Sequence, residues 1–154
     1  MEDIRRILAV SWMTQYCRRT VHCAGSLAAK YGAELSVIHV IDTSSLQGWN
    51  LPGMSQVEER RKDSERIEAE LDTIIGGETK GGAKIRRIIK EGDPVEEILK
   101  IIGDEKIDLV VLCANEEGRI ERFLVGSSSS NDAIIRKMPC SIFLVKNEPE
   151  PEAP

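Results

Sequence analysis

Side chains suited to nucleophilic or acid–base chemistry are few in this chain of 154 residues. It has two histidines: His22 stands in a helix-like stretch and His39 in a strand-like run, and neither belongs to a catalytic motif. Such catalysis needs a nucleophile beside a positioned base. We therefore predict a surface role for His22, a hydrogen-bonded core position for His39, and no catalytic residue.

The four cysteines also lack the spacing that metal sites or disulfide frameworks use. Cys17, Cys23, Cys113 and Cys140 are scattered, with no C-x-x-C and no nearby pair of histidines at metal-ligand spacing. Cysteine is among the most frequently buried residue types. We expect buried thiols, no metal and no disulfide framework.

The charge balance argues against nucleic acid and membranes as partners. The chain has 21 basic and 26 acidic residues, a formal charge of −5, and its only basic pairs are short ones such as Arg5-Arg6 and Arg86-Arg87. A duplex binder gathers many more cations on one face. No apolar run approaches the roughly 18 residues that span a bilayer, and the start does not resemble a signal peptide. We expect a cytoplasmic protein.

The elements that position these residues alternate between short apolar runs and amphipathic stretches. Alternating strands and helices with right-handed crossovers predict a three-layer α/β/α sandwich around a five-stranded parallel sheet. Residues 1–146 form one domain in this interpretation, and residues 147–154 an acidic, disordered tail. The expected strands are 6–11, 35–41, 83–90, 108–113 and 139–145, and the expected helices begin near Cys17, Ser55, Pro94 and Ser127.

Helix boundaries carry their own signals. Gly32 is placed to end the first helix, Ser55 to cap the second, and Asp93 to cap the third ahead of Pro94. The glycine pairs 76–77 and 81–82 predict a turn before the third strand. The residues expected on the apolar helix faces are Val21, Ala24, Ala28 and Tyr31, then Val57, Ile67, Leu71 and Ile74, then Val95, Ile98, Leu99 and Ile102.

Between Ile4 and Lys146, six short motifs follow one another in a distinctive order. They are Ile7-Leu8-Ala9-Val10, residues 28–35, His39-Val40-Ile41-Asp42, Gly92-Asp93-Pro94, Gly126-Ser127 and residues 139–145. This succession resembles the universal stress protein family. The resemblance implies an adenine nucleotide alpha hydrolase-like fold with strand order 3-2-1-4-5, a homodimer paired through the last strand, and in some members an adenine-nucleotide site at the carboxyl ends of strands one and four.

ATP-binding members of that family end strand one with Asp and follow strand four with G-x-x-G-x9-G-[ST]. Glycine lets such a loop bring backbone amides close to phosphates, and the helix that follows adds partial positive charge. Here Trp12 stands at the Asp position, and Cys113 and Glu116 stand at the first two glycine positions. A carboxylate about 5 Å from a phosphate charge costs about 3 kcal/mol at a dielectric near 20, or over a hundredfold in affinity. We expect no cofactor, and ATP binding that is lost or weak.

Parts of the family's site remain. The resemblance places the backbone of Val40 against adenine, and Gly126 and Ser127 at the phosphate-facing start of the last helix. One interpretation is that these residues form a residual anion site together with Ser128. The other is that Ser127 caps the last helix. Trp12 likewise has two interpretations: it fills the adenine pocket, or it packs with Trp49 beneath the loop at 42–54.

The sequence therefore predicts a binding protein rather than an enzyme. We expect a dimeric universal stress protein with lost or weak nucleotide binding that acts through its surface in a stress response. The alternative is an ATP- or AMP-binding switch with slow ATP hydrolysis through a rebuilt loop at 114–125. The dimer would pair through residues 140–145, because the apolar run Ile142-Phe143-Leu144-Val145 would otherwise be an exposed strand edge.

Overall fold

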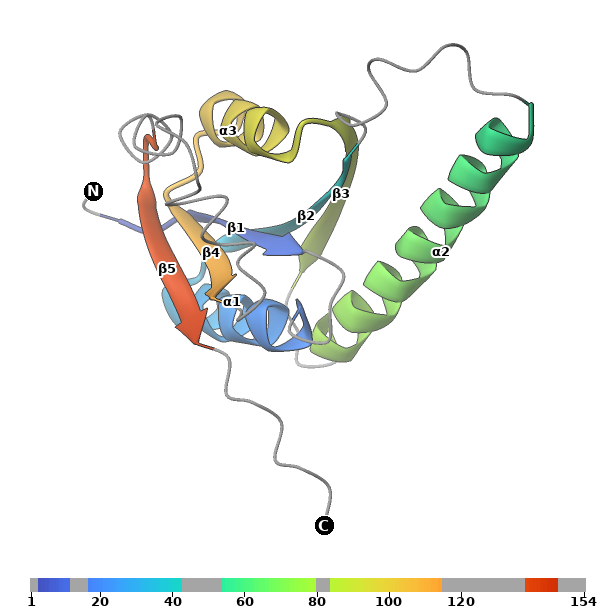
Figure 1. The fold of residues 1–154 in the computed structure, drawn as a ribbon. Coiled ribbons are helices and arrows are strands. Elements are labelled where there is room, and N and C mark those ends of the chain that lie inside the picture. The colour runs from blue at the N-terminus through green and yellow to red at the C-terminus, as the bar shows by residue number, and fades with distance from the viewer. Residues whose placement is uncertain (1–2, 12–16, 43–53, 80–83, 115–137, 147–154) are drawn as a thin grey trace.

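The computed structural model describes residues 3–11, 17–42, 54–79, 84–114 and 138–146, and they form alternating strands and helices (Figure 1). The strands are short runs of apolar residues, and the helices stand between them in the chain. In chain order the elements are β1 (Arg6–Ser11), α1 (Cys17–Tyr31), β2 (Glu34–Asp42), α2 (Met54–Thr79), β3 (Ile85–Gly92), α3 (Pro94–Asp104), β4 (Leu109–Ala114) and β5 (Ser141–Lys146).

All five strands run parallel in one sheet with the order β3-β2-β1-β4-β5. The predicted fold class and strand order are confirmed, and each observed strand lies within two residues of its predicted bounds. β1 is central, with β2 and β4 as neighbours, and β3 and β5 form the two edges. The predicted helix at 127–137 and the predicted tail at 147–154 lie outside the described residues.

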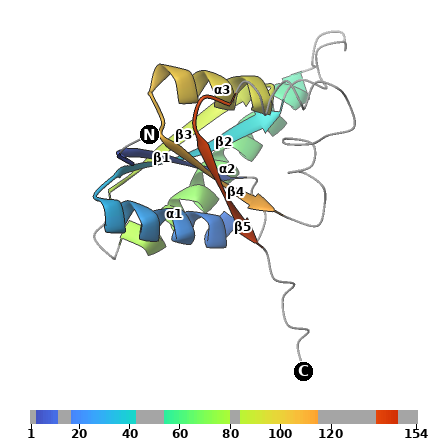
Figure 2. The ribbon, with the colours of Figure 1, turned by 90° about the vertical axis from the view of Figure 1, so that its left-hand side faces the viewer.

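Helices cover both faces of the sheet, as a parallel sheet with two apolar faces requires (Figure 2). Because successive side chains of a strand point to opposite faces, Leu8 and Val10 of β1 pack on one side and Ile7 and Ala9 on the other. The first face is covered by Ile98, Ile101 and Ile102 of α3, and the second by Val21, Ala24 and Ala28 of α1 with Leu71 and Ile75 of α2.

The predicted boundaries of α1 and α3 are confirmed. Gly32 adopts a φ of +64° directly after α1, a conformation that glycine reaches without steric cost. Asp93 caps α3: its Oδ1 accepts the backbone N–H of Val95 at 2.9 Å and that of Glu96 at 3.2 Å. Pro94 follows at the first helical position, where a missing N–H removes no helical hydrogen bond.

The prediction that α2 begins near Ser55 is confirmed, but the predicted cap and the predicted end were wrong. The helix begins at Met54, so Ser55 lies in its first turn instead of capping it, and it continues through Gly76 and Gly77 to Thr79. Glycine disfavours a helix by only about 1 kcal/mol, and the last turn has contacts that local sequence patterns do not reveal. Thr79 Oγ1 donates to the carbonyl of Gly76 at 3.1 Å, and Glu78 lies 3.1 Å from His22 of α1.

Several predictions of burial also need correction. Tyr31, the last residue of α1, is 53% exposed. In α3, Ile101 is buried where Leu99 was expected, and Leu99 is only partly buried. Cys23 and Cys140 are free thiols that are partly exposed rather than buried; nothing is described of the side chains of Cys17 and Cys113.

Candidate functional site

The strand order creates a switch point at the carboxyl ends of β1 and β4. From β1 the chain builds outward through β2 to β3, and it then returns to the other side of β1 to form β4. The register between β1 and β4 ends at the pair Ala9–Val111, although β1 continues to Ser11 and β4 to Ala114. Ligands of open parallel sheets bind in the crevice at such a point. This crevice is the candidate site that the sequence predicted.

The carboxyl ends of three adjacent strands form a buried floor at this switch point. Val10, Ser11, Val40 and Leu112 are all buried at the ends of three adjacent strands. His39, also buried, donates from Nδ1 to the carbonyl oxygen of Ser11 at 2.9 Å, which ties β2 to the last residue of β1. The prediction that His39 is a hydrogen-bonded core residue is confirmed.

The structure describes only part of the predicted site. Val40 lies on β2 in the floor, and the backbone of Cys113 pairs with Val145 near the end of β4. The other positions named from the sequence lie outside the described residues, and so do both interpretations of Trp12. These positions are Trp12, Trp49, Glu116, Gly126, Ser127 and Ser128.

The described ranges offer no cluster of metal ligands. Within them, no three His, Cys, Asp or Glu side chains gather as metal ligands. His22 is on the surface of α1, as predicted, and it contacts Glu78 of α2. No helix in the described part of the chain has both the length and the apolar character needed to cross a membrane.

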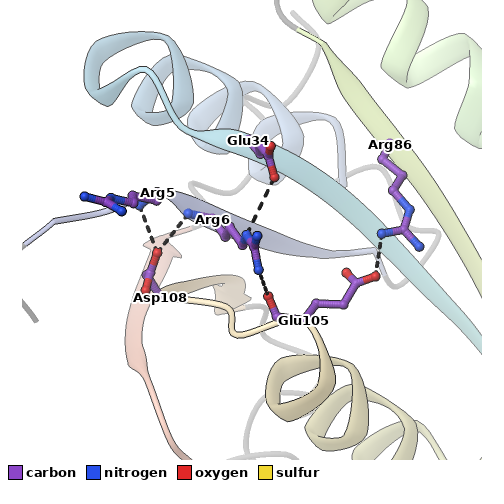
Figure 3. A network of polar contacts seen from close by, with 6 residues as sticks. All are labelled: Arg5, Arg6, Glu34, Arg86, Glu105 and Asp108. Carbon is purple, nitrogen blue, oxygen red and sulfur yellow. Dashed lines mark hydrogen bonds and ion pairs between the residues drawn. The ribbon is translucent and has the colours of Figure 1, made fainter.

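A polar cluster at the opposite, amino end of the sheet escaped the sequence analysis (Figure 3). Asp108, just before β4, accepts the backbone N–H groups of Arg5 and Arg6 through Oδ2 at 2.9 Å each. Arg6 donates from Nη1 to the carbonyl of Glu105 at 2.8 Å, and the Glu105 carboxylate pairs with Arg86 of β3. In the sequence, Arg5-Arg6 and Arg86-Arg87 stood out only as short basic pairs. The usable signal was their position at the starts of strands that a parallel sheet brings together.

Cys140 lies beside this cluster and is a poor nucleophile. Burial, assisted by the negative charge of Asp108, raises the pKa of the Cys140 thiol to about 11, while a backbone hydrogen bond with Val110 acts in the opposite direction. The thiolate is the reactive form of cysteine. Near neutral pH this thiol therefore stays largely protonated.

Comparison with known proteins places these features in a family. Residues 3–146 match the family model described as "Universal stress protein family". A universal stress protein of Methanothermobacter thermautotrophicus is 25% identical over 148 residues, which cover 95% of this chain and 99% of that protein.

Solved structures share the fold. The structure of hypothetical protein MJ0577, from Methanocaldococcus jannaschii, aligns with a TM-score of 0.72 and 22% identity over 94% of this chain and 97% of its own. A universal stress protein in complex with cAMP aligns with a TM-score of 0.66 and 19% identity over 94% of this chain and 98% of its own. At these identities the likeness supports the shared fold alone.

Proposed function

The chain belongs to the universal stress protein family, and we propose that it is a dimeric, cytoplasmic binding protein of a stress response whose affinity for adenine nucleotides is lost or weak. Its mechanism would be association with a partner rather than turnover of a substrate. The observation that carries this proposal is the identity of three residues at the family's nucleotide motif: Trp12, Cys113 and Glu116.

The described floor of the crevice agrees with this proposal. A related fold holds cAMP, so the architecture itself accommodates an adenine nucleotide. In this chain the ends of β1, β2 and β4 contribute buried apolar side chains, and His39 is engaged with the carbonyl of Ser11. The charged and glycine-rich parts of a nucleotide site come from the strand ends and the loops after them, and in this chain's sequence the replacements remove a base-recognising carboxylate and two close backbone approaches.

A second candidate function keeps the nucleotide. Gly126, Ser127 and Ser128 preserve the phosphate-facing end of the motif, and the switch point is present in the sheet. These features favour a nucleotide-regulated switch, with slow ATP hydrolysis, in which the loop at 114–125 reaches the phosphates in a new way. The two candidates differ in one measurable quantity, the affinity for ATP.

Calorimetric titration with ATP and Mg²⁺ tests both candidates. We expect no binding heat up to millimolar ATP for the natural chain, because the motif lacks its recognition carboxylate and its first two glycines. A restored variant, W12D/C113G/E116G, should gain affinity by roughly a hundredfold or more, the scale of one removed carboxylate–phosphate repulsion.

The substitution H22Q, on exposed α1, is the control and should behave as the natural chain does. Micromolar affinity in the natural chain would overturn the proposed function in favour of the switch. Absence of heat in the natural chain together with gained affinity in the restored variant would reject the switch.

A further inference from the structure

The outer edge of β3 carries backbone groups that no described strand pairs with. β3 forms one end of the strand order (Figure 1), and it pairs with β2 along its whole length from Ile85 to Gly92. In the part of the chain that the structure describes, no backbone hydrogen bond joins β3 to any element other than β2. On an edge strand, alternate N–H and C=O groups point away from the sheet. An added strand can therefore bind to them.

Basic side chains follow this edge on the face of the sheet that α3 covers. Ile88 packs on that face, and because side chains of a strand alternate, Arg86 and Lys90 lie on it too. Lys84, directly before β3, lines the same cleft as Arg86. Arg86 contacts Glu105 (Figure 3), but its side chain stays 63% exposed. Lys84 and Lys90 are exposed and form no ion pair with a described residue.

The other face of the same edge is mainly apolar. Ile85 and Ile89 pack against the core beneath α1 and α2, and each is only partly buried. Arg87 stands between them and already pairs with Asp72 of α2. Glu91, near the end of β3, is the only acidic residue of the strand. This face therefore favours apolar side chains in a neighbouring strand, whereas the face with Lys90 favours carboxylates.

We infer that an extended segment of a partner protein, with acidic and apolar side chains in alternation, adds to the sheet beside β3. The alternation matches the two faces, because successive side chains of a strand point to opposite sides. The partner's carboxylates lie beside Arg86 and Lys90, and its apolar side chains lie beside Ile85 and Ile89. The inference rests on the proposed role as an interaction protein, and it specifies the chemistry of the partner.

Charge decides which strands this edge accepts. A second copy of β3 would bring its own Arg86, Arg87 and Lys90 against the same cations, and like charges on paired strands destabilise the pairing. β5 of a second copy has no acidic residue to offer. A strand with carboxylates on one face avoids this repulsion. Because exposed ion pairs are individually weak, the backbone hydrogen bonds of the added strand must contribute to the binding as well.

Capped heptapeptides provide the probe, because blocked termini leave only side-chain charges. Glu-Val-Glu-Val-Glu-Val-Glu has the inferred alternation. One analogue has Lys for every Glu, and a second, Glu-Glu-Val-Val-Val-Glu-Glu, keeps the composition but loses the alternation. A third has Pro for the central Val and lacks that backbone N–H. Each peptide is titrated into the full ¹⁵N-labelled chain.

We expect the alternating acidic peptide to shift the amides of Arg86, Ile88 and Lys90 and to leave that of Val145, on the opposite edge strand, unchanged. It should also slow hydrogen exchange at every second amide of β3, because those amides face away from β2 and gain a partner. Its affinity should exceed that of each analogue by roughly tenfold, the scale of one or two weak contacts.

Two double variants separate the charge of this edge from the net charge of the chain. K84E/K90E reverses the two lysines that form no described ion pair, so it should weaken binding of the acidic peptide by roughly tenfold and strengthen binding of the lysine analogue. R19E/K30E, on exposed positions of α1, changes the net charge equally and should leave both affinities unchanged. The amide spectra check that both variants are folded.

Absence of amide shifts at millimolar acidic peptide would overturn the inference. So would shifts without slower exchange in β3, equal binding of the proline analogue, or equal effects of the two double variants. The ATP titration is independent of this result, because the crevice lies at the ends of β1 and β4 and β2 separates β3 from it. Nucleotide affinity there would overturn the proposed function, whereas failure of the peptides alone would remove only the partner assigned to β3.

Discussion

Asp108 joins two neighbouring strands with one side chain. Its Oδ2 accepts the N–H groups of Arg5 and Arg6, and its own N–H donates to the carbonyl of Arg6 at 2.9 Å. These are backbone groups at the start of β1, where the strand pairing has only begun. A charged acceptor forms stronger hydrogen bonds than a neutral one, so Asp108 fixes where β1 and β4 start relative to each other.

The same carboxylate affects the reactivity of Cys140. Because the pKa of this thiol is raised to about 11 in the folded state, first by burial and then by Asp108, little thiolate exists at pH 8. We expect Cys140 to react with iodoacetamide roughly a hundredfold more slowly in the folded protein than in the urea-unfolded chain at that pH. Peptide-level mass spectrometry measures the two rates separately from those of the other cysteines.

The pH dependence of this reaction follows from the sign of the shift. The rate in the folded protein should rise about tenfold per pH unit and level off only near pH 11. D108N removes the charge but keeps an acceptor oxygen, so it should speed the reaction by less than unfolding does, because burial is the larger cause. Equal rates in folded and unfolded protein at pH 8 would contradict the raised pKa of this thiol.

At the scale of the element, α3 is stabilised by the capping residue that precedes it. Asp93 accepts two of the N–H groups that no helical carbonyl reaches. D93A should therefore lower the free energy of unfolding by about 1 kcal/mol, the usual loss for a removed N-cap. Urea unfolding, followed by circular dichroism, measures this free energy.

D93N is the control, because it retains an acceptor at the same place. Its free energy of unfolding should stay within a few tenths of a kcal/mol of that of the natural chain. Equal stability of all three proteins would show that the cap is dispensable.

The elements themselves were largely predictable from the sequence, because their signals are local. A buried parallel strand such as β4 is a continuous apolar run, and the cap of α3 lies within four residues. The end of α2 was not predictable in this way. Its last turn includes a contact between Glu78 and His22, which lie 56 residues apart in the chain.

The two ends of the sheet also differ in how far they could be predicted from the sequence. The crevice at the carboxyl ends was predictable because the resemblance to a family supplied the strand order, and the register of β1 with β4 agrees with its place. The amino-end cluster was not, because Arg6, Glu105 and Asp108 meet only once that order is known. Their position at the starts of strands becomes a signal only after that order has been assigned.

At the scale of the whole molecule, the two edges of the sheet differ in character. Along β3 the side chains of Arg86, Arg87 and Lys90 are exposed, and charged residues on an edge strand discourage pairing with another sheet. Along β5, Phe143 is 39% exposed and Leu144 48% exposed. An apolar edge strand is open to pairing, which supports the proposed dimer through residues 140–145 rather than through β3.

Charges placed on β5 test this assembly. F143K/L144K withdraws two apolar side chains from the proposed interface and sets like charges opposite each other, so it should weaken the dimer by about 3 kcal/mol or more, over a hundredfold in Kd. Sedimentation at micromolar concentration should find the natural chain as a dimer and this variant as a monomer of about 17.1 kDa.

K90A, on the β3 edge, is the control and should remain dimeric. Circular dichroism checks that all three proteins are folded. A natural chain that sediments only as a monomer would refute pairing through β5, and a dimeric F143K/L144K would move the interface to another surface.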